Sequence, residues 1–199
     1  MRFIVCMVLA LYSLSTLAQT DKGLQNQLMK LAEQNMQVRQ SLEKYASGKV
    51  PQALQSVVTE IDNLHTQTLK EIVTLHGWPS KNKVGEKGIQ ATFLLIQNSQ
   101  DLAFQQDMLP LIIQSFIDKE GITGQDVAQF TDNVSLKLGK KQVFGTQAEL
   151  IDGKVIFAPI ENKDSVDQLR DQMGMKSLAE YKKGLEVFYS SENITDSDL

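Results

Sequence analysis

Apolar residues recur at helical spacing along the first part of the chain. One stripe advances by alternating steps of four and three residues and is apolar at every position except Asn35. Its members are Leu24, Leu28, Leu31, Asn35, Val38, Leu42 and Tyr45. Residues at this spacing share one face of an α-helix, so the stripe predicts a long helix that ends at Ser47 and Gly48.

A second helix is predicted from Pro51 to about Leu75. Proline suits the first helical position, and Gly77 followed by Pro79 stops the helix at its other end. The broad apolar face of this segment consists of Leu54, Val57, Val58, Ile61, Leu64, Thr68, Leu69, Ile72 and Leu75. The spacing again favours a helix that packs one side against a core.

The next segment has a different pattern. Residues 89–99 are apolar on all sides through Phe93 to Ile96, which is typical of a helix enclosed by others. We therefore expect the centre of the fold between His76 and Gln105. Asp101 is placed to cap the following helix, which Pro110 is expected to bend or interrupt.

Capping boxes mark two later helix starts. Thr123 precedes Asp126 by three residues, and Ser177 precedes Glu180 by the same spacing. Between these starts, residues 142–160 carry apolar residues on both sides of Asp152-Gly153, which is a strong signal for the turn of a β-hairpin. A short helix is also expected from Ser165 to Met173.

These elements predict a mainly α fold. We expect a single-domain helical bundle over residues 19–189, with one β-hairpin at about 142–160, in the C-terminal third. The segment 190–199 is polar and acidic and is predicted to be a disordered tail.

The first eighteen residues match a secretory signal peptide. Arg2 supplies a positive start, Phe3 to Leu17 an apolar stretch, and Ala18 a small residue at the expected cleavage site. The sequence thus predicts an exported protein, periplasmic or secreted, with no stable membrane insertion after signal cleavage. Cys6, the one cysteine, lies in the signal, so the mature chain contains no thiol for catalysis, disulfides or metal binding.

Charge and motifs exclude several functions. The formal net charge is −4 and the basic residues are scattered, so we expect no nucleic-acid partner. Standard motifs for nucleotide binding and hydrolysis are absent, and no cofactor is expected. His65 and His76 lie on one predicted helix but about 16 Å apart at 1.5 Å per residue, too far to share a metal ion. No metal site is predicted.

Polar residues within apolar stripes are the informative feature. They are Asn35, His65 with Asp62, Gln97 with Asn98, and Gln105. A polar group buried without a partner costs a few kcal/mol, so these residues should either bond to one another or contact ligand and water. The first alternative is an internal network that fixes helix register. The second is a polar cavity between helices, with Arg39, His76 and Trp78 at its mouth.

Several short motifs together resemble one family. They are His76-Gly77-Trp78-Pro79, Val84-Gly85-Glu86, Leu95-Ile96-Gln97-Asn98, Phe104-Gln105, Asp132-Asn133-Val134, Gly139 with Gln142, Phe144-Gly145-Thr146-Gln147 and Pro159-Ile160-Glu161. In this order they are similar to a bacterial family of unknown function with HGWP, QHAD and YGTQ motifs. The similarity spans roughly Leu28 to Tyr181 and implies a bacterial source, but no established activity.

The chain departs from that family pattern at four positions. The family has Asp at the position of Asn35, Asn at that of His65, His at that of Asn98 and Arg at that of Asn133. If the family site moves protons with a carboxylate and a histidine, this chain lacks both at Asn35 and Asn98. The resemblance then disfavours an enzyme unless His65 or His76 substitutes.

Three functional hypotheses follow. The leading one is an exported domain that binds a small polar ligand or a cell-envelope component in an inter-helix pocket. Its predicted binding residues are Arg39, Trp78, Gln97, Asn98, Gln105 and Gln147, with Trp78 as a stacking wall and the amides as hydrogen-bonding groups. The rival is a hydrolase or transferase with Asp62 or His76 as general base and Arg39 holding an anion. The third is a structural protein that dimerises through the first helix. Oligomeric state is open.

Overall fold

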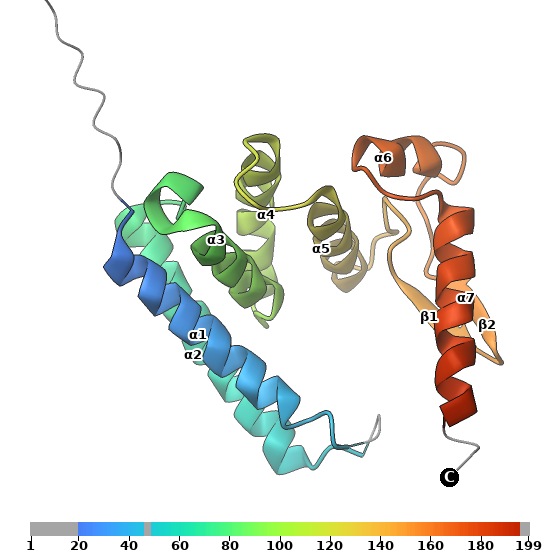
Figure 1. Ribbon diagram of the computed structural model, residues 1–199, viewed down its shortest axis with the longest axis horizontal. Helices are drawn as coiled ribbons and strands as arrows, with labels where there is room; N and C mark the ends of the chain where they lie inside the picture. The colour runs from blue at the N-terminus through green and yellow to red at the C-terminus, as the bar shows by residue number, and fades with distance from the viewer. Residues whose placement is uncertain (1–19, 46–48, 196–199) are drawn as a thin grey trace, which may run out of the picture.

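The first five helices of the computed structural model form a row, and a smaller C-terminal part stands at one end of it (Figure 1). The structure describes the backbone of residues 20–45 and 49–195, and the side chains as far as residue 189. The predicted signal peptide, residues 1–18, lies outside these residues. None of the described helices combines the length and the hydropathy of a membrane span.

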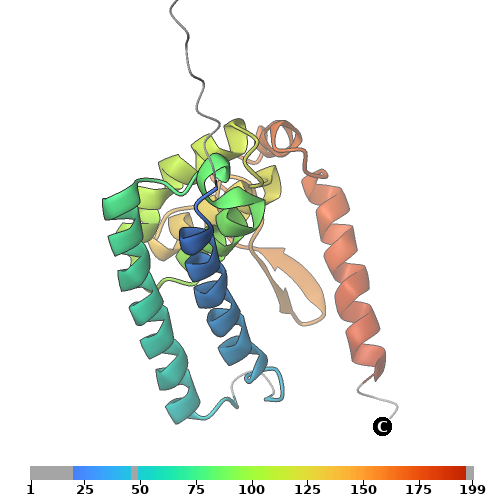
Figure 2. The same cartoon turned by 60° about the vertical axis from the view of Figure 1, so that its left-hand side comes forward.

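Helix α1 (Lys22–Gln40) and helix α2 (Gln52–His76) run side by side (Figures 1 and 2). Leu24, Leu28 and Asn35 of the predicted stripe are buried, as is Ala32. The helix ends seven residues earlier than Ser47, because the chain passes into tight turns in which Leu42 N–H donates to Arg39 O. Helix α2 has nearly the predicted bounds.

Helix α3 (Lys81–Gln97) lies between the α1–α2 pair and α4 (Leu102–Ile117), as Figures 1 and 2 show. Ile89 and Ile96 are fully buried and Phe93 and Leu95 nearly so, so the expectation of an enclosed helix is confirmed. Helix α3 also extends eight residues further toward the N-terminus than predicted. A kink at Gly85, whose φ of 68° suits glycine, joins the added turn to the rest of the helix.

The predicted helix caps are confirmed. Asp101 accepts from the Phe104 N–H at the start of α4, and Thr123 with Asp126 forms a complete capping box at α5 (Gly124–Lys137). Pro110 lies inside α4 and does not interrupt it. Pro110 is exposed, so the carbonyl that lacks an amide partner can bond to water instead.

The β-hairpin is also confirmed. Strands β1 (Ala148–Ile151) and β2 (Lys154–Phe157) pair antiparallel around Asp152 and Gly153. Both turn residues have positive φ, 50° and 73°, as a two-residue turn matching the twist of the strands requires. The strands occupy the middle of the predicted range 142–160. Outside the strands, Gln142 and Ile160 form an isolated parallel bridge.

Two helices complete the chain. They are α6 (Val166–Gln172) and α7 (Leu178–Thr195), and Ser177 with Glu180 caps the second as predicted. Helix α7 reaches Thr195, so its backbone is helical over most of the segment predicted to be a disordered tail, 190–199. The helix continues because no glycine or proline follows Gly184. Residues 196–199 lie outside the described part.

Close packing at Gly124 gives the first prediction. A Cβ at this position would collide with the backbone carbonyl of Met173, between α5 and α6. Gly124→Ala is therefore expected to destabilise the protein by about 1–3 kcal/mol, because the backbone must move. Chemical denaturation of the variant measures this change.

Gly184 of α7 provides the matched control, because nothing lies within 4 Å of a Cβ built there. Gly184→Ala should stabilise the protein by about 0.5–1 kcal/mol through helix propensity alone. The two Gly→Ala substitutions should thus have opposite signs. Stabilisation by Gly124→Ala would contradict the packing between α5 and α6.

Candidate functional site

A cluster of polar side chains joins the first two helices to the turn between α3 and α4. Its members are Asn35 and Arg39 of α1, Asp62 and His65 of α2, and Asn98 and Gln100 after α3. We call these six residues the Asn35 cluster. Asn35, Asp62 and His65 are buried, whereas Arg39 and Asn98 are partly exposed and Gln100 is exposed.

Asp62 is the acceptor at the centre of this cluster. Its carboxylate forms a salt bridge with Arg39 Nη2 at 2.8 Å and accepts from Asn35 Nδ2 at 2.9 Å and from Gln100 Nε2 at 3.2 Å. The Asp62 side chain has no exposed surface, while that of Arg39 is 31% exposed. The buried negative charge is therefore compensated by a cation that reaches solvent.

Asn35 connects the rest of the cluster. Its Oδ1 accepts from Arg39 Nη1 and from Asn98 Nδ2, each at 2.7 Å. Its Nδ2 donates to Asp62 and lies 3.4 Å from His65 Nδ1. Because Arg39 can only donate and a carboxylate can only accept, the orientation of the Asn35 amide is fixed. Both protons and both oxygen lone pairs of that amide thus have partners.

This orientation determines the state of His65. The amide nitrogen of Asn35 presents a proton to Nδ1, so Nδ1 accepts and the proton of the neutral ring resides on Nε2. Burial lowers the pKa of His65, and the Arg39 charge adds to this effect, while Asp62 opposes it. A neutral imidazole with Nε2–H as a donor is the form that this environment favours.

His65 also lines a groove between α1 and α2, which we call the His65 groove. The groove has a volume of about 410 Å³. Its lining residues are Gln34, Gln37, Val38, Ser41, Ile61, Leu64 and His65. Two buried side-chain polar atoms of the described residues have no partner, Trp78 Nε1 and Thr131 Oγ1. His65 Nε2 is not one of them and makes no described hydrogen bond, so it is open to the groove.

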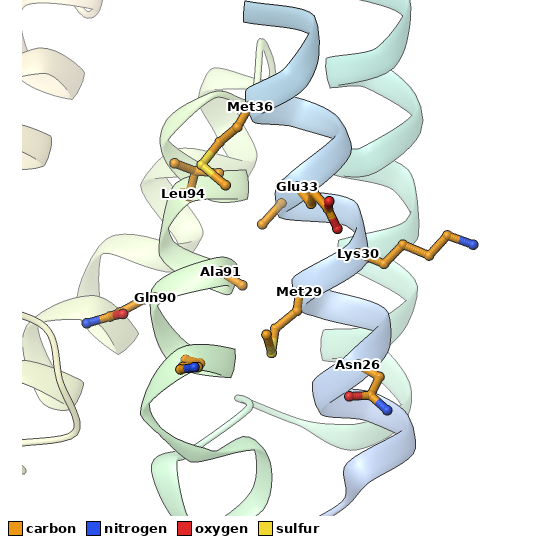
Figure 3. Close-up of a pocket in the computed structure, with 10 residues that line it drawn as sticks. Asn26, Met29, Lys30, Glu33, Met36, Gln90, Ala91 and Leu94 are labelled. Carbon is orange, nitrogen blue, oxygen red and sulfur yellow. The ribbon is translucent and has the colours of Figure 1, made fainter. Parts of the chain in front are cut away.

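A larger groove of about 680 Å³ lies on the other side of α1, against α3 (Figure 3). Met36 and Leu94 point toward one another across it, and Ala91 faces it from α3, while Lys30 points away. The floor is apolar and the charged residues Lys30, Glu33 and Lys87 stand at its rim. Only Ala32 and Ala91 of its lining residues are buried, so no buried polar group directs a ligand here.

The structure brings together three of the eight predicted site residues, Arg39, Asp62 and Asn98. His76 is exposed at the end of α2, where its backbone carbonyl accepts from Lys83 Nζ. Trp78 is half-buried against the core, and its buried Nε1 has no partner in the described part. Neither side chain belongs to the Asn35 cluster.

The three predicted glutamines lie apart from this cluster as well. Gln97 is exposed. Gln105 is buried and donates to the carbonyls of Ile96 and Gln97, so it caps the end of α3, and its Oε1 accepts from Lys137. Gln147 is half-buried beside the hairpin, and its Nε2 donates to Thr146. These contacts are internal hydrogen bonds.

A second polar cluster lies between α5 and the C-terminal elements. Asp132 is fully buried and accepts from the amides of Val143, Phe144 and Thr146 and from the Thr146 hydroxyl, at 2.6–3.0 Å. Gln142 bonds to both backbone groups of Gln147. Arg170 of α6 is also buried in this region. No sequence pattern predicted its burial, because its neighbours Leu169 and Asp171 do not form part of a clear apolar stripe.

The fold and these sites define the class of protein to which the chain belongs, a mainly helical domain with a β-hairpin and buried polar clusters. The described residues contain no group of three or more His, Cys, Asp and Glu side chains suited to hold a metal ion. The chain belongs to the DUF6624 family, a family of unknown function, whose model matches residues 22–193. Searches of curated proteins and of solved structures found no match.

Proposed function

We propose that this chain is an exported domain that binds a small polar ligand in the His65 groove without transforming it. The apolar pattern of residues 1–18 supports export. The volume of the groove, about 410 Å³, falls within the range of roughly 300–1,000 Å³ typical of small-molecule sites. Apolar walls from Val38, Ile61 and Leu64 alternate with the amides of Gln34 and Gln37.

The open Nε2 of His65 is the observation that carries this proposal. The His65 residue is only 4% exposed and lines the groove, yet one of its ring nitrogens has no hydrogen-bond partner among the described residues. Without a ligand, this donor can bond only to water, so a bound acceptor such as a carbonyl, hydroxyl or carboxylate oxygen can replace that water and form a hydrogen bond at a site largely shielded from solvent. A ligand with one such acceptor and a small apolar part fits the lining.

The Asn35 cluster serves this site by holding the ring. Asn35 fixes the Nδ1 side of His65, and Arg39 and Asn98 in turn fix Asn35. A ring held on one edge presents its other edge in one orientation, which reduces the entropy lost when a ligand binds. This arrangement explains why several polar residues from two helices and the turn after α3 lie behind a single histidine.

Binding is favoured over catalysis by the position of Asp62. A general base must reach the proton that it removes, but the Asp62 side chain has no exposed surface and its oxygens accept from three side chains. His76, the other predicted base, is exposed and lines none of the grooves described above.

Thermal melting in the presence of sugars, amino acids and dipeptides tests this proposal. A ligand that binds only the folded protein stabilises it by about 2.7 kcal/mol at 100 times its dissociation constant, so the melting temperature should rise. The rise should disappear in His65→Phe, because phenylalanine lacks the donor. NMR of the ligand should show no turnover.

His76→Phe is the matched control, because it makes the same change at the exposed histidine of the same helix. Each variant is compared with its own ligand-free melting temperature, so a stability change alone does not affect the result. A ligand response that survives in His65→Phe, or turnover of the ligand, would contradict the proposal.

A further inference from the structure

Arg170 of α6 is a cation in an unusual place. The residue is only 1% exposed and has the largest side chain of the fully buried residues. Its Nε donates to Lys176 O at 2.7 Å, and its Nη1 donates to Phe144 O at 2.8 Å and to Gly145 O at 3.4 Å. Backbone carbonyls thus hold the guanidinium in a fixed position.

No carboxylate balances this charge at close range. In the described part of the chain, Arg170 forms no salt bridge within 4.0 Å. Burial lowers the pKa of Arg170, and two acids, Asp167 and Asp132, raise it through their charge, but both are engaged elsewhere. Asp167 accepts from the Leu178 amide and Asp132 from the loop amides. The ring of Tyr181, 4.9 Å away, provides only a cation–π contact. A buried charge with so little compensation is costly.

The third guanidinium nitrogen of Arg170, Nη2, faces a pocket. Nη2 makes no hydrogen bond with any described residue, and it is absent from the buried unpartnered atoms, so it reaches the neighbouring pocket. This pocket of about 340 Å³ is lined by Gln125, Gln129, Thr146, Arg170, Gly174, Met175, Lys176 and Tyr181. None of these residues is acidic, and two are basic. We call it the Arg170 pocket.

We propose that the Arg170 pocket binds a small oxyanion, a carboxylate or a phosphate group, with Arg170 Nη2 as the central donor. Guanidinium groups pair with both kinds of anion through charge-assisted hydrogen bonds. The amides of Gln125 and Gln129 and the Lys176 ammonium supply further donors from the pocket lining. The site involves α5, α6 and α7, whereas the His65 groove lies between α1 and α2, so the two proposals stand independently.

Melting temperatures in three salts test this site. Sodium phosphate, sodium acetate and sodium chloride are added at equal ionic strength to the full protein in a buffer free of oxyanions. Phosphate or acetate is expected to raise the melting temperature in a saturable way at low concentration, whereas the non-specific stabilisation by phosphate excluded from the protein surface grows steadily with concentration and is the same in every variant. The anion with the larger saturable effect identifies the oxyanion as phosphate or carboxylate.

Removing Arg170 could unfold the protein, so the decisive variant keeps it. Gln129→Glu has almost the same shape and places a carboxylate in the pocket, where it pairs with the guanidinium and repels an added anion. The affinity for the anion should fall at least about tenfold, because like charges at close range cost several kcal/mol and 1.4 kcal/mol corresponds to tenfold. The ligand-free melting temperature should not fall.

Gln106→Glu is the matched control, because it adds the same charge at an exposed position of α4 outside the pocket. This variant should keep the response to the anion, as should His65→Phe. The absence of a saturable rise with both phosphate and acetate would overturn the proposal. So would an anion response that Gln129→Glu leaves unchanged.

Discussion

Asp132→Ala is expected to destabilise the protein by about 3–5 kcal/mol, because it leaves three loop amides without an acceptor in a buried place. The carboxylate accepts from the amides of Val143, Phe144 and Thr146 and from the Thr146 hydroxyl. The loss is a large part of a typical folding free energy of about 5–15 kcal/mol. Urea denaturation measures it.

Two further variants test the cause of this loss. Asp132→Asn keeps the shape but replaces one accepting oxygen with an NH₂ group, so it should recover only part of the stability. Asp107→Ala removes an exposed carboxylate of α4 and should change the stability by less than about 0.5 kcal/mol. A small effect of Asp132→Ala would mean that water replaces the carboxylate.

Because the same loop supplies the Phe144 and Gly145 carbonyls to Arg170, Asp132→Ala should also weaken anion binding.

Arg39→Met is expected to destabilise the protein by about 2–4 kcal/mol, because it leaves the buried Asp62 carboxylate without its counter-charge. This value lies below the full range for a buried pair, because the Arg39 side chain is 31% exposed and solvent screens part of the interaction. Asp62→Asn should cost less, since water can hydrate the remaining guanidinium. Urea denaturation of both variants gives this order.

Lys70→Met provides the comparison for a surface pair. Lys70 also forms a salt bridge from α2, with Asp101, but both side chains are more than a third exposed. Its loss should cost no more than about 1 kcal/mol. An equal cost for Arg39→Met and Lys70→Met would contradict the buried character of the Asn35 cluster.

The sequence predicted the elements of the fold well wherever a local signal was present. Asp101 and Thr123 cap their helices, and Asp152 with Gly153 forms the hairpin turn, because each signal acts within a few residues. The end of α1 was placed too late. The apolar residues Leu42 and Tyr45 continue the helical spacing, but both are only half-buried in the turns after the helix.

The candidate site was predicted in part. Polar residues inside apolar stripes correctly marked burial at Asn35, Asp62, His65 and Gln105. The pattern could not distinguish polar residues that make internal hydrogen bonds from polar residues that face a groove. Gln105 caps the carbonyls at the end of α3, whereas His65 has one nitrogen open to a groove. Each use depends on a partner that is distant in sequence or on a hollow formed by another helix.

Sequence alone determined where helices occur, the caps at their starts, the hairpin turn and the mainly helical class, because these follow from side-chain periodicity and hydrogen bonds over a few residues. Only the tertiary structure decided which polar groups meet. Asn35 and Asn98 are 63 positions apart, and Arg170 bonds to Phe144 from 26 positions away. Helix packing sets such distances, and with them the charge balance and the open nitrogens on which both proposed binding sites depend.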